Sequence, residues 1–225
     1  FNFLTFTHTR KFHKKRYKLR PYLVEGVPVW MYDVVDADEE FSVSHYRFLA
    51  SSIIDQIRKR GKLPIVVGGT GLYIRALTKP LDILDVPPDR ALRTILSEMT
   101  VEQLQKKLEH DDPERWALMN HSDGANLRRL IRAIEIAAWK KNHQGQSLVD
   151  NPSIDTLMIG LSAEPNVLKE NIRTRVIARL DSGVTQEIKI FFATHNTSGL
   201  PAQTALGLHL VKQHIHGELS KDALI

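Results

Sequence analysis

Four consecutive residues, Gly68-Gly69-Thr70-Gly71, form a turn that could hold a phosphate group. They follow the short apolar run Leu63–Val67 and precede a stretch with helical spacing, so their backbone N–H groups and the helix dipole are directed at one spot. We reject a dinucleotide site, because the third glycine of that fingerprint is missing and the next acid at the expected distance, Asp89, lies in a proline-rich loop. No Walker A pattern occurs in the chain. The alternative is a tight strand-to-helix turn that needs small residues.

The arginine-rich segment Asn126–Glu135 could bind an anion. At 100° per residue its leucines and isoleucines form a buried stripe, while Arg128, Arg132 and Glu135 share the other face. Arg128 and Arg132 are four residues apart, a like-charge spacing that destabilises an isolated helix unless an anion lies over it. A phosphate backbone would supply that anion. The alternative is a solvated helix face with an Arg132–Glu135 pair.

A second helix with arginines is expected over Val167–Leu180. Ile172 and Val176 belong to its apolar stripe, Arg175 falls at the edge of the stripe, and Arg179 falls within it. Two guanidinium groups beside a core-facing stripe suggest a desolvated anion site, because unpaired charge is costly there. A buried acid on the sheet domain is the alternative partner.

Metal and paired-carboxylate sites are weaker hypotheses. His209, His214 and His216 cluster near the end of the chain, but no carboxylate stands at a matching spacing, so we interpret them as surface residues. The acids between Asp33 and Asp38 are more simply a solvated turn into a helix. The absence of cysteine removes disulfides, thiolate nucleophiles and every zinc site that needs sulfur.

The elements that must position these residues alternate between strand and helix. Val27–Val35 reads as a strand, and a helix with its N-cap at Ser42 runs up to Gly61. Leu63–Val67 has the continuous apolar character of a strand buried on both faces, and another helix follows the glycine turn. The order strand, helix, strand, helix predicts a parallel sheet.

From about residue 85 the pattern becomes helical. Thr100 and Gln103 make a capping box, and Asp111-Asp112-Pro113 marks another helix start. We therefore predict a helical insert of about 65 residues.

Strand character returns at Ile154–Leu161, and a helix over Pro165–Asp181, closed by Gly183, follows. The sheet domain is thus expected to be interrupted and resumed, and helices are expected to fill the rest of the chain. The predicted division is a core over 1–84 and 152–225 with an insertion over 85–151.

The chain of 225 residues is 42% hydrophobic and 25% charged, which indicates a folded globular protein. Residues 1–25 hold seven Lys/Arg and one acid, so this segment accounts for the net charge of +5, and we interpret it as a solvated basic arm. No apolar run is long enough to span a membrane and no signal pattern is present, so we expect a cytoplasmic protein. The chain begins at Phe1, which we interpret as a sign that it is a piece of a longer protein.

Three of these stretches, in this order, resemble the tRNA dimethylallyltransferase family, also called the tRNA isopentenyltransferases. The matching segments are Val34–Val43, Gly61–Tyr73 and Asn126–Glu135, with fainter support from Ile172–Gly183 and Pro201–Ile225. The resemblance covers residues 26–190 well.

The resemblance implies an α/β fold with a P-loop NTPase-like parallel sheet core and a helical insertion domain. The core would bind a nucleotide, ATP, and the insertion domain would bind tRNA. The implied reaction transfers a dimethylallyl group from its diphosphate to the exocyclic amine of an adenosine next to the tRNA anticodon, with Mg²⁺ on the diphosphate. We identify no magnesium ligands in this chain, and we expect a monomer.

The resemblance also implies site residues. Thr70 and Arg175 would be catalytic, and together with Gly68 and Gly69 they would bind the diphosphate. The implied tRNA contacts are Thr70, Arg93, Arg128, Arg129, Leu130, Ile131, Arg132, Thr204, Ala205, Leu206, Gly207, Leu208 and His209.

The chain departs from the family pattern in five respects. We find neither the P-loop nor the catalytic aspartate, and Val29-Trp30 stands where the family has a histidine pair. Gly207-Leu208-His209 lacks the usual aromatic and basic residues, and the closing basic segment is missing. We therefore expect this chain alone to be inactive. The alternatives are a non-catalytic RNA-binding protein on the same scaffold and a small nucleotide kinase-like domain.

Overall fold

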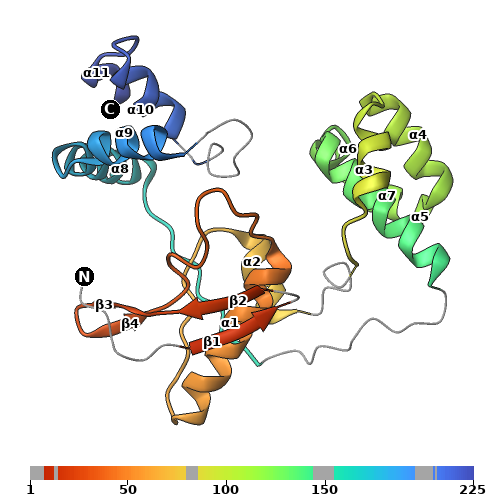
Figure 1. The fold of residues 1–225 in the computed structure, drawn as a ribbon, viewed down its shortest axis with the longest axis horizontal. Coiled ribbons are helices and arrows are strands. Elements are labelled where there is room, and N and C mark those ends of the chain that lie inside the picture. The colour runs from red at the N-terminus through yellow and green to blue at the C-terminus, as the bar shows by residue number, and fades with distance from the viewer. Residues whose placement is uncertain (1–7, 13–14, 80–85, 144–154, 196–204, 206) are drawn as a thin grey trace. The chain divides into compact units, whose positions relative to one another are not determined.

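The computed structural model describes residues 8–12, 15–79, 86–143, 155–195, 205 and 207–225 (Figure 1). The chain divides into two compact units, and each is considered by itself. The first comprises Phe1–Pro64 with Thr156–Ile225, and the second comprises Ile65–Asp155.

The first unit begins with two antiparallel hairpins. Strands β1 (His8–Phe12) and β2 (Lys15–Leu19) form one, and β3 (Tyr22–Val24) and β4 (Val27–Val29) form the other. Tyr17 and Leu19 of β2 are buried in a cluster with Leu49 and Ile53 of helix α1. The prediction of a solvated arm over residues 1–25 is therefore wrong for β2, because alternate side chains of this strand contribute to a core.

Helix α1 (Val43–Lys59) has the ends that the sequence predicts. Ser42 and His45 form a capping box at its start. At its end Gly61 has a φ of +67°, and the N–H groups of Gly61 and Lys62 donate to the carbonyls of Arg58 and Ile57. These two bonds form a Schellman motif, which requires the left-handed conformation that glycine adopts without strain.

The predicted parallel strands are absent from the described residues. Leu63–Val67 and the described part of Ile154–Leu161 form neither helix nor paired strand, and Val67 and Leu161 are 90% and 95% exposed. The predicted strand over Val27–Val35 ends at Val29, and Met31 and Asp33 have positive φ values. An apolar run forms a strand only when a neighbouring strand pairs with its backbone, and no described strand pairs with either run.

The second unit is helical and carries its core between four of its helices (Figure 1). Its elements are α2 (Gly71–Thr78), α3 (Arg90–Ser97), α4 (Val101–Asp111), α5 (Pro113–Ala117), α6 (His121–Gly124) and α7 (Leu127–Asn142). Leu96, Leu104, Leu108, Leu130 and Ile134 form the centre of the core, with Trp116 of α5 packed against it. The predicted helix starts are confirmed: Thr100 and Gln103 form a capping box, and Asp112 caps α5 ahead of Pro113.

The remaining helices of the first unit are α8 (Pro165–Asp181), α9 (Val184–Thr194), α10 (Leu208–Ile215) and α11 (Lys221–Leu224). They confirm the predicted helix over Pro165–Asp181 and the helical end of the chain. Gly183, with a φ of +98°, lies between α8 and α9, as the sequence predicts for a terminating glycine. None of the described helices combines the length and apolar character needed to cross a membrane.

Candidate functional site

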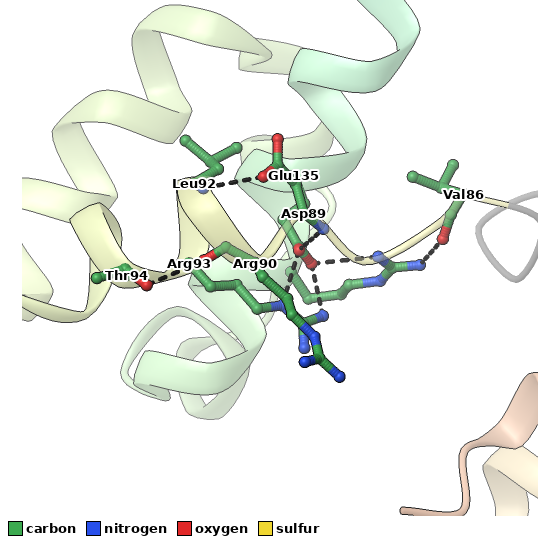
Figure 2. A network of polar contacts seen from close by, with 8 residues as sticks. Val86, Asp89, Arg90, Leu92, Arg93, Thr94 and Glu135 are labelled. Atoms are coloured by element: carbon green, nitrogen blue, oxygen red, sulfur yellow. Dashed lines mark hydrogen bonds and ion pairs between the residues drawn. The ribbon is translucent and has the colours of Figure 1, made fainter.

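A buried carboxylate organises the arginines of the helical unit. Glu135 of α7 is 2% exposed, and its two oxygens accept a forked pair of hydrogen bonds from Arg93 of α3, at 2.7 Å from Nε and 2.8 Å from Nη2 (Figure 2). The backbone N–H of Asp89 donates to the same carboxylate at 2.8 Å. Arg132 donates to Glu135 Oε2 at 3.1 Å and to the carbonyl of Val86 at 2.7 Å. The network therefore joins α7 to α3 and to the segment that precedes α3.

The environment of Glu135 favours its charged form. Burial, the largest single influence, raises the pKa of the carboxyl group. The hydrogen bonds from Arg93, the Asp89 N–H and Arg132 together outweigh burial, so the pKa of Glu135 lies below its usual value of 4.5. Glu135 is accordingly a buried anion with charge-assisted partners on two sides.

The placement of Glu135 corrects the helical-wheel prediction. The wheel puts Glu135 on the face opposite the buried stripe, yet Glu135, Ile136 and Ala137 are all buried. The α7 helix is covered on two sides, because α4 packs on one side and α3 on another. A wheel built from α7 alone contains no information about the second covering helix.

The other arginines of α7 have different surroundings. Arg129 forms an ion pair with Asp123, whereas Arg128 is exposed and has no ion pair among the described residues. The predicted Arg132–Glu135 pair is present, but its acid is buried rather than solvated. Leu130 is fully buried and Ile131 packs on the same core, so both residues serve packing in this unit.

The glycine turn ahead of α2 is open. Thr70 is the N-cap residue of α2, and its side chain makes no capping hydrogen bond. A Cβ atom added to Gly68, Gly69 or Gly71 would have no neighbour within 4 Å, and none of the three has a positive φ. Neither close packing nor backbone strain therefore requires glycine here, which disfavours the alternative of a tight turn that needs small residues.

The arginines of α8 are not desolvated. Arg175 and Arg179 are both exposed, and Ile172 of the apolar stripe is 43% exposed. The prediction of arginines beside a core-facing stripe is therefore wrong for the described structure, since the stripe on this helix has no complete cover. Arg179 lies at a small apolar pocket with Val176 and residues of α9, α10 and α11. Thr70 and Arg175 belong to different units, and their predicted convergence on one anion stays a prediction.

The predicted contact segment near the C-terminus is only partly described. Thr204 and Leu206 lie outside the described residues, Ala205 is exposed, and Gly207 caps α10 with a φ of +82°. Leu208 and His209 begin α10, with His209 exposed.

Metal-ligating side chains do not gather in one place among the described residues. Among them no group of three or more His, Cys, Asp or Glu side chains could hold a metal ion. His214 is half-buried with Nδ1 2.8 Å from the Leu219 carbonyl, which corrects the surface interpretation for this histidine, while His216 lies 3.6 Å from Glu218.

Comparison with known proteins gives the family. A family model described as IPP transferase matches residues 16–225. The chain belongs to the IPP transferase family. Similar curated members of this family include the tRNA dimethylallyltransferase of Exiguobacterium sp., 34% identical over 202 residues, and that of Geobacillus thermodenitrificans, 34% identical over 220 residues. These alignments cover 88% and 92% of this chain but 63% and 67% of the relatives, so the chain spans about two thirds of their length.

Solved IPP transferase structures are similar to this chain as well. The full-length tRNA isopentenylpyrophosphate transferase of Bacillus halodurans is 30% identical with a TM-score of 0.55, and the alignment covers 89% of this chain and 63% of that one. The enzyme of Staphylococcus epidermidis is 25% identical with a TM-score of 0.52. The described structure shares their mixed α/β content but is rich in helix.

Two features of this family member were not foreseen from its sequence. Glu135 was expected on the polar face of α7, and its bond to Arg93 crosses 42 positions of the chain, beyond any local periodicity. The ordered basic hairpin was expected to be a solvated arm. The alternation of Tyr17 and Leu19 with basic residues is the signal that could have indicated it.

Proposed function

We propose that this chain is part of an enzyme that transfers a dimethylallyl group from dimethylallyl diphosphate to the exocyclic amine of an adenosine beside the anticodon of a tRNA. The observation that carries the proposal is the family match over residues 16–225, together with relatives named tRNA dimethylallyltransferase. In this proposal the glycine turn and Arg175 bind the diphosphate of the donor, and the helical unit binds the tRNA.

The open turn suits the diphosphate. Gly68 and Gly69 leave space beside the backbone, and the hydroxyl of Thr70 is not used for capping. Departure of diphosphate leaves negative charge on its oxygens and positive charge on the allylic carbon. Backbone N–H groups at the start of α2, the Thr70 hydroxyl and the exposed Arg175 guanidinium would stabilise that negative charge.

The helical unit suits the RNA. Arg128 is an exposed cation without an ion pair among the described residues, and it lies one helical turn from the Glu135 network. We assign it to a backbone phosphate, which fixes the position of the tRNA without reading its sequence. The target base must leave the base stack before its amine can react. Contacts that hold the surrounding stem in place would support this extrusion.

Two finer statements belong to the same proposal. The mixed α/β part is proposed to be of P-loop NTPase-like type, which is supported by the strand-forming composition of Leu63–Val67 directly before the glycine turn. Mg²⁺ is proposed by resemblance alone, and none of the described residues is identified as its ligand, so no step of the reaction is assigned to it.

Binding measurements test the proposal with a matched pair of variants. Fluorescence anisotropy with a labelled anticodon stem-loop is expected to show weaker binding for Arg128→Ala and a salt slope reduced by about one, because one phosphate contact is lost. Lys106→Ala removes an exposed cation from α4 and is the control, with an unchanged slope expected.

Titration calorimetry with dimethylallyl diphosphate tests the donor side. We expect the wild-type chain to bind it and Arg175→Ala to bind it more weakly. Binding of the stem-loop without any binding of the diphosphate would favour the non-catalytic RNA-binding alternative. Failure to bind either ligand would contradict the proposal altogether.

A further inference from the structure

The β1–β2 hairpin separates its side chains into two faces. Tyr17 and Leu19 of β2 are 4% and 2% exposed and point into the cluster with α1. Because successive side chains of a strand alternate between faces, Arg16 and Lys18 point away from that cluster. Their register partners on β1 are Lys11 and Thr9, which lie on the same outer face.

The outer face carries uncompensated positive charge. Lys11 lies directly opposite Arg16, and Lys18 follows Arg16 two residues along β2. All three are exposed, and none of their side chains has an ion pair or hydrogen bond within the part of the chain that the structure describes. Lys15 differs, because it projects from the other face and pairs with Glu39. Like charges placed directly opposite destabilise a strand pair, so the native hairpin keeps an unfavourable arrangement that an anion would relieve.

We propose that this basic face, defined as Lys11, Arg16 and Lys18, binds the phosphate backbone of the tRNA on which the proposed function rests. Cross-strand and diagonal neighbours on one sheet face lie within about 8 Å of one another, so three cations act on the same short stretch of polyanion. The hairpin is anchored through Tyr17 and Leu19, and the strand backbones are therefore held in place before the RNA arrives.

The composition of the basic face defines what it recognises. Thr9 is the other described residue on this side of the hairpin, which therefore carries no aromatic side chain among its described residues on which a base could stack. The contribution to binding is therefore electrostatic and independent of RNA sequence. The face also lacks large apolar side chains that would insert into a lipid bilayer, which favours RNA over an anionic membrane surface.

The experiment compares three versions of the full chain in anticodon stem-loop binding across a range of salt concentrations. One carries Lys11→Gln, Arg16→Gln and Lys18→Gln. The matched control carries Lys62→Gln, Lys106→Gln and Lys189→Gln, which removes the same charge from three scattered exposed sites. The third carries Lys11→Arg, Arg16→Lys and Lys18→Arg, which keeps the charge and changes the side chains.

We expect the first variant to lose on the order of tenfold in affinity and its salt slope to fall by about two to three, because each phosphate contact contributes about 0.7–0.9 to that slope. The scattered control is expected to change the slope by less than one, and the charge-preserving variant is expected to bind like the wild type. The loss is expected to be equal for stem-loops with and without the target adenosine.

Several outcomes overturn the inference. If the wild type binds the stem-loop and the first variant has the same salt slope, the basic face does not bind RNA phosphates. The proposed function is not affected by that result. Failure of the wild type to bind any stem-loop rejects the proposed function, and the inference with it. Binding to phosphatidylserine vesicles that depends on these three residues, with RNA binding unchanged, assigns the face to a membrane instead. Circular dichroism of each variant shows whether it is folded. If the first variant is unfolded and the charge-preserving variant also binds RNA weakly, the result counts against the inference.

Discussion

At the scale of single residues, the same arginines link internal stability to the proposed interface. Arg93 and Arg132 bind a buried carboxylate while their side chains stay 46% and 30% exposed. A buried charge with several charge-assisted partners is tolerated, whereas the loss of one partner leaves an uncompensated charge. Glu135 also relieves the repulsion between Arg128 and Arg132, which the spacing on α7 would otherwise impose.

Glu135→Gln is expected to destabilise the helical unit by roughly 1–3 kcal/mol at pH 7, because hydrogen bonds between charged groups are lost. The pKa of Glu135 is lowered in the folded state, so the folded protein binds this proton less tightly than the unfolded chain does. The stabilisation is therefore complete above about pH 5 and disappears as the pH falls below 4.5 through the folded-state pKa.

Urea unfolding followed by circular dichroism between pH 7 and pH 3 measures this difference. Glu109→Gln replaces an exposed glutamate of α4 that has no ion pair among the described residues, and it should change stability by less than about 0.5 kcal/mol. If the difference in free energy of unfolding between the wild type and Glu135→Gln is the same at pH 3 as at pH 7, the charge of Glu135 is not the stabilising feature.

At the scale of elements, helix ends were predictable and strands were not. The caps at Ser42, Thr100 and Asp112 involve a side chain and a backbone N–H three residues away, so the sequence contains both partners. The run Leu63–Val67 has the composition of a strand, but its partners would have to come from elsewhere, and no described strand pairs with it. Strand composition shows only that a segment could pair.

Gly183→Ala tests the junction between α8 and α9. The φ of +98° places a side chain in a conformation that L-residues rarely adopt, so a loss of about 1–2 kcal/mol is expected. Gly183→Asn should lose less, because asparagine tolerates the left-handed region better. Gly160→Ala, at a glycine with open space and no positive φ, is the control. Equal thermal midpoints for Gly183→Ala and Gly160→Ala would mean that the junction does not depend on this conformation.

At the scale of the whole molecule, the chain consists of two units whose segments differ widely in how far they are buried from solvent. The core of α3, α4 and α7 is fully buried at Leu96, Leu104 and Leu130. The segments 63–67 and 157–161 instead expose apolar side chains, and among the described residues their backbone N–H groups donate to no backbone carbonyl. Such regions open at the lowest free energy in a protein.

Hydrogen–deuterium exchange followed by mass spectrometry should therefore separate the two classes. Peptides covering 63–67 and 157–161 are expected to exchange within seconds, while peptides from α4 and α7 are expected to stay protected for far longer. Protection of 63–67 equal to that of α7 would contradict the unpaired state of this segment.

The sequence by itself determined the helices, their caps, the glycine turn and the motifs of the IPP transferase family, because each of these depends on residues a few positions apart. Only the tertiary structure decided that Glu135 is buried between two helices, that the basic segment forms a hairpin with one packed face, and that Leu63–Val67 and the described part of Ile154–Leu161 pair with no described strand. These outcomes depend on which distant segment covers a given face, and the free energy of burial or pairing is a property of both partners together.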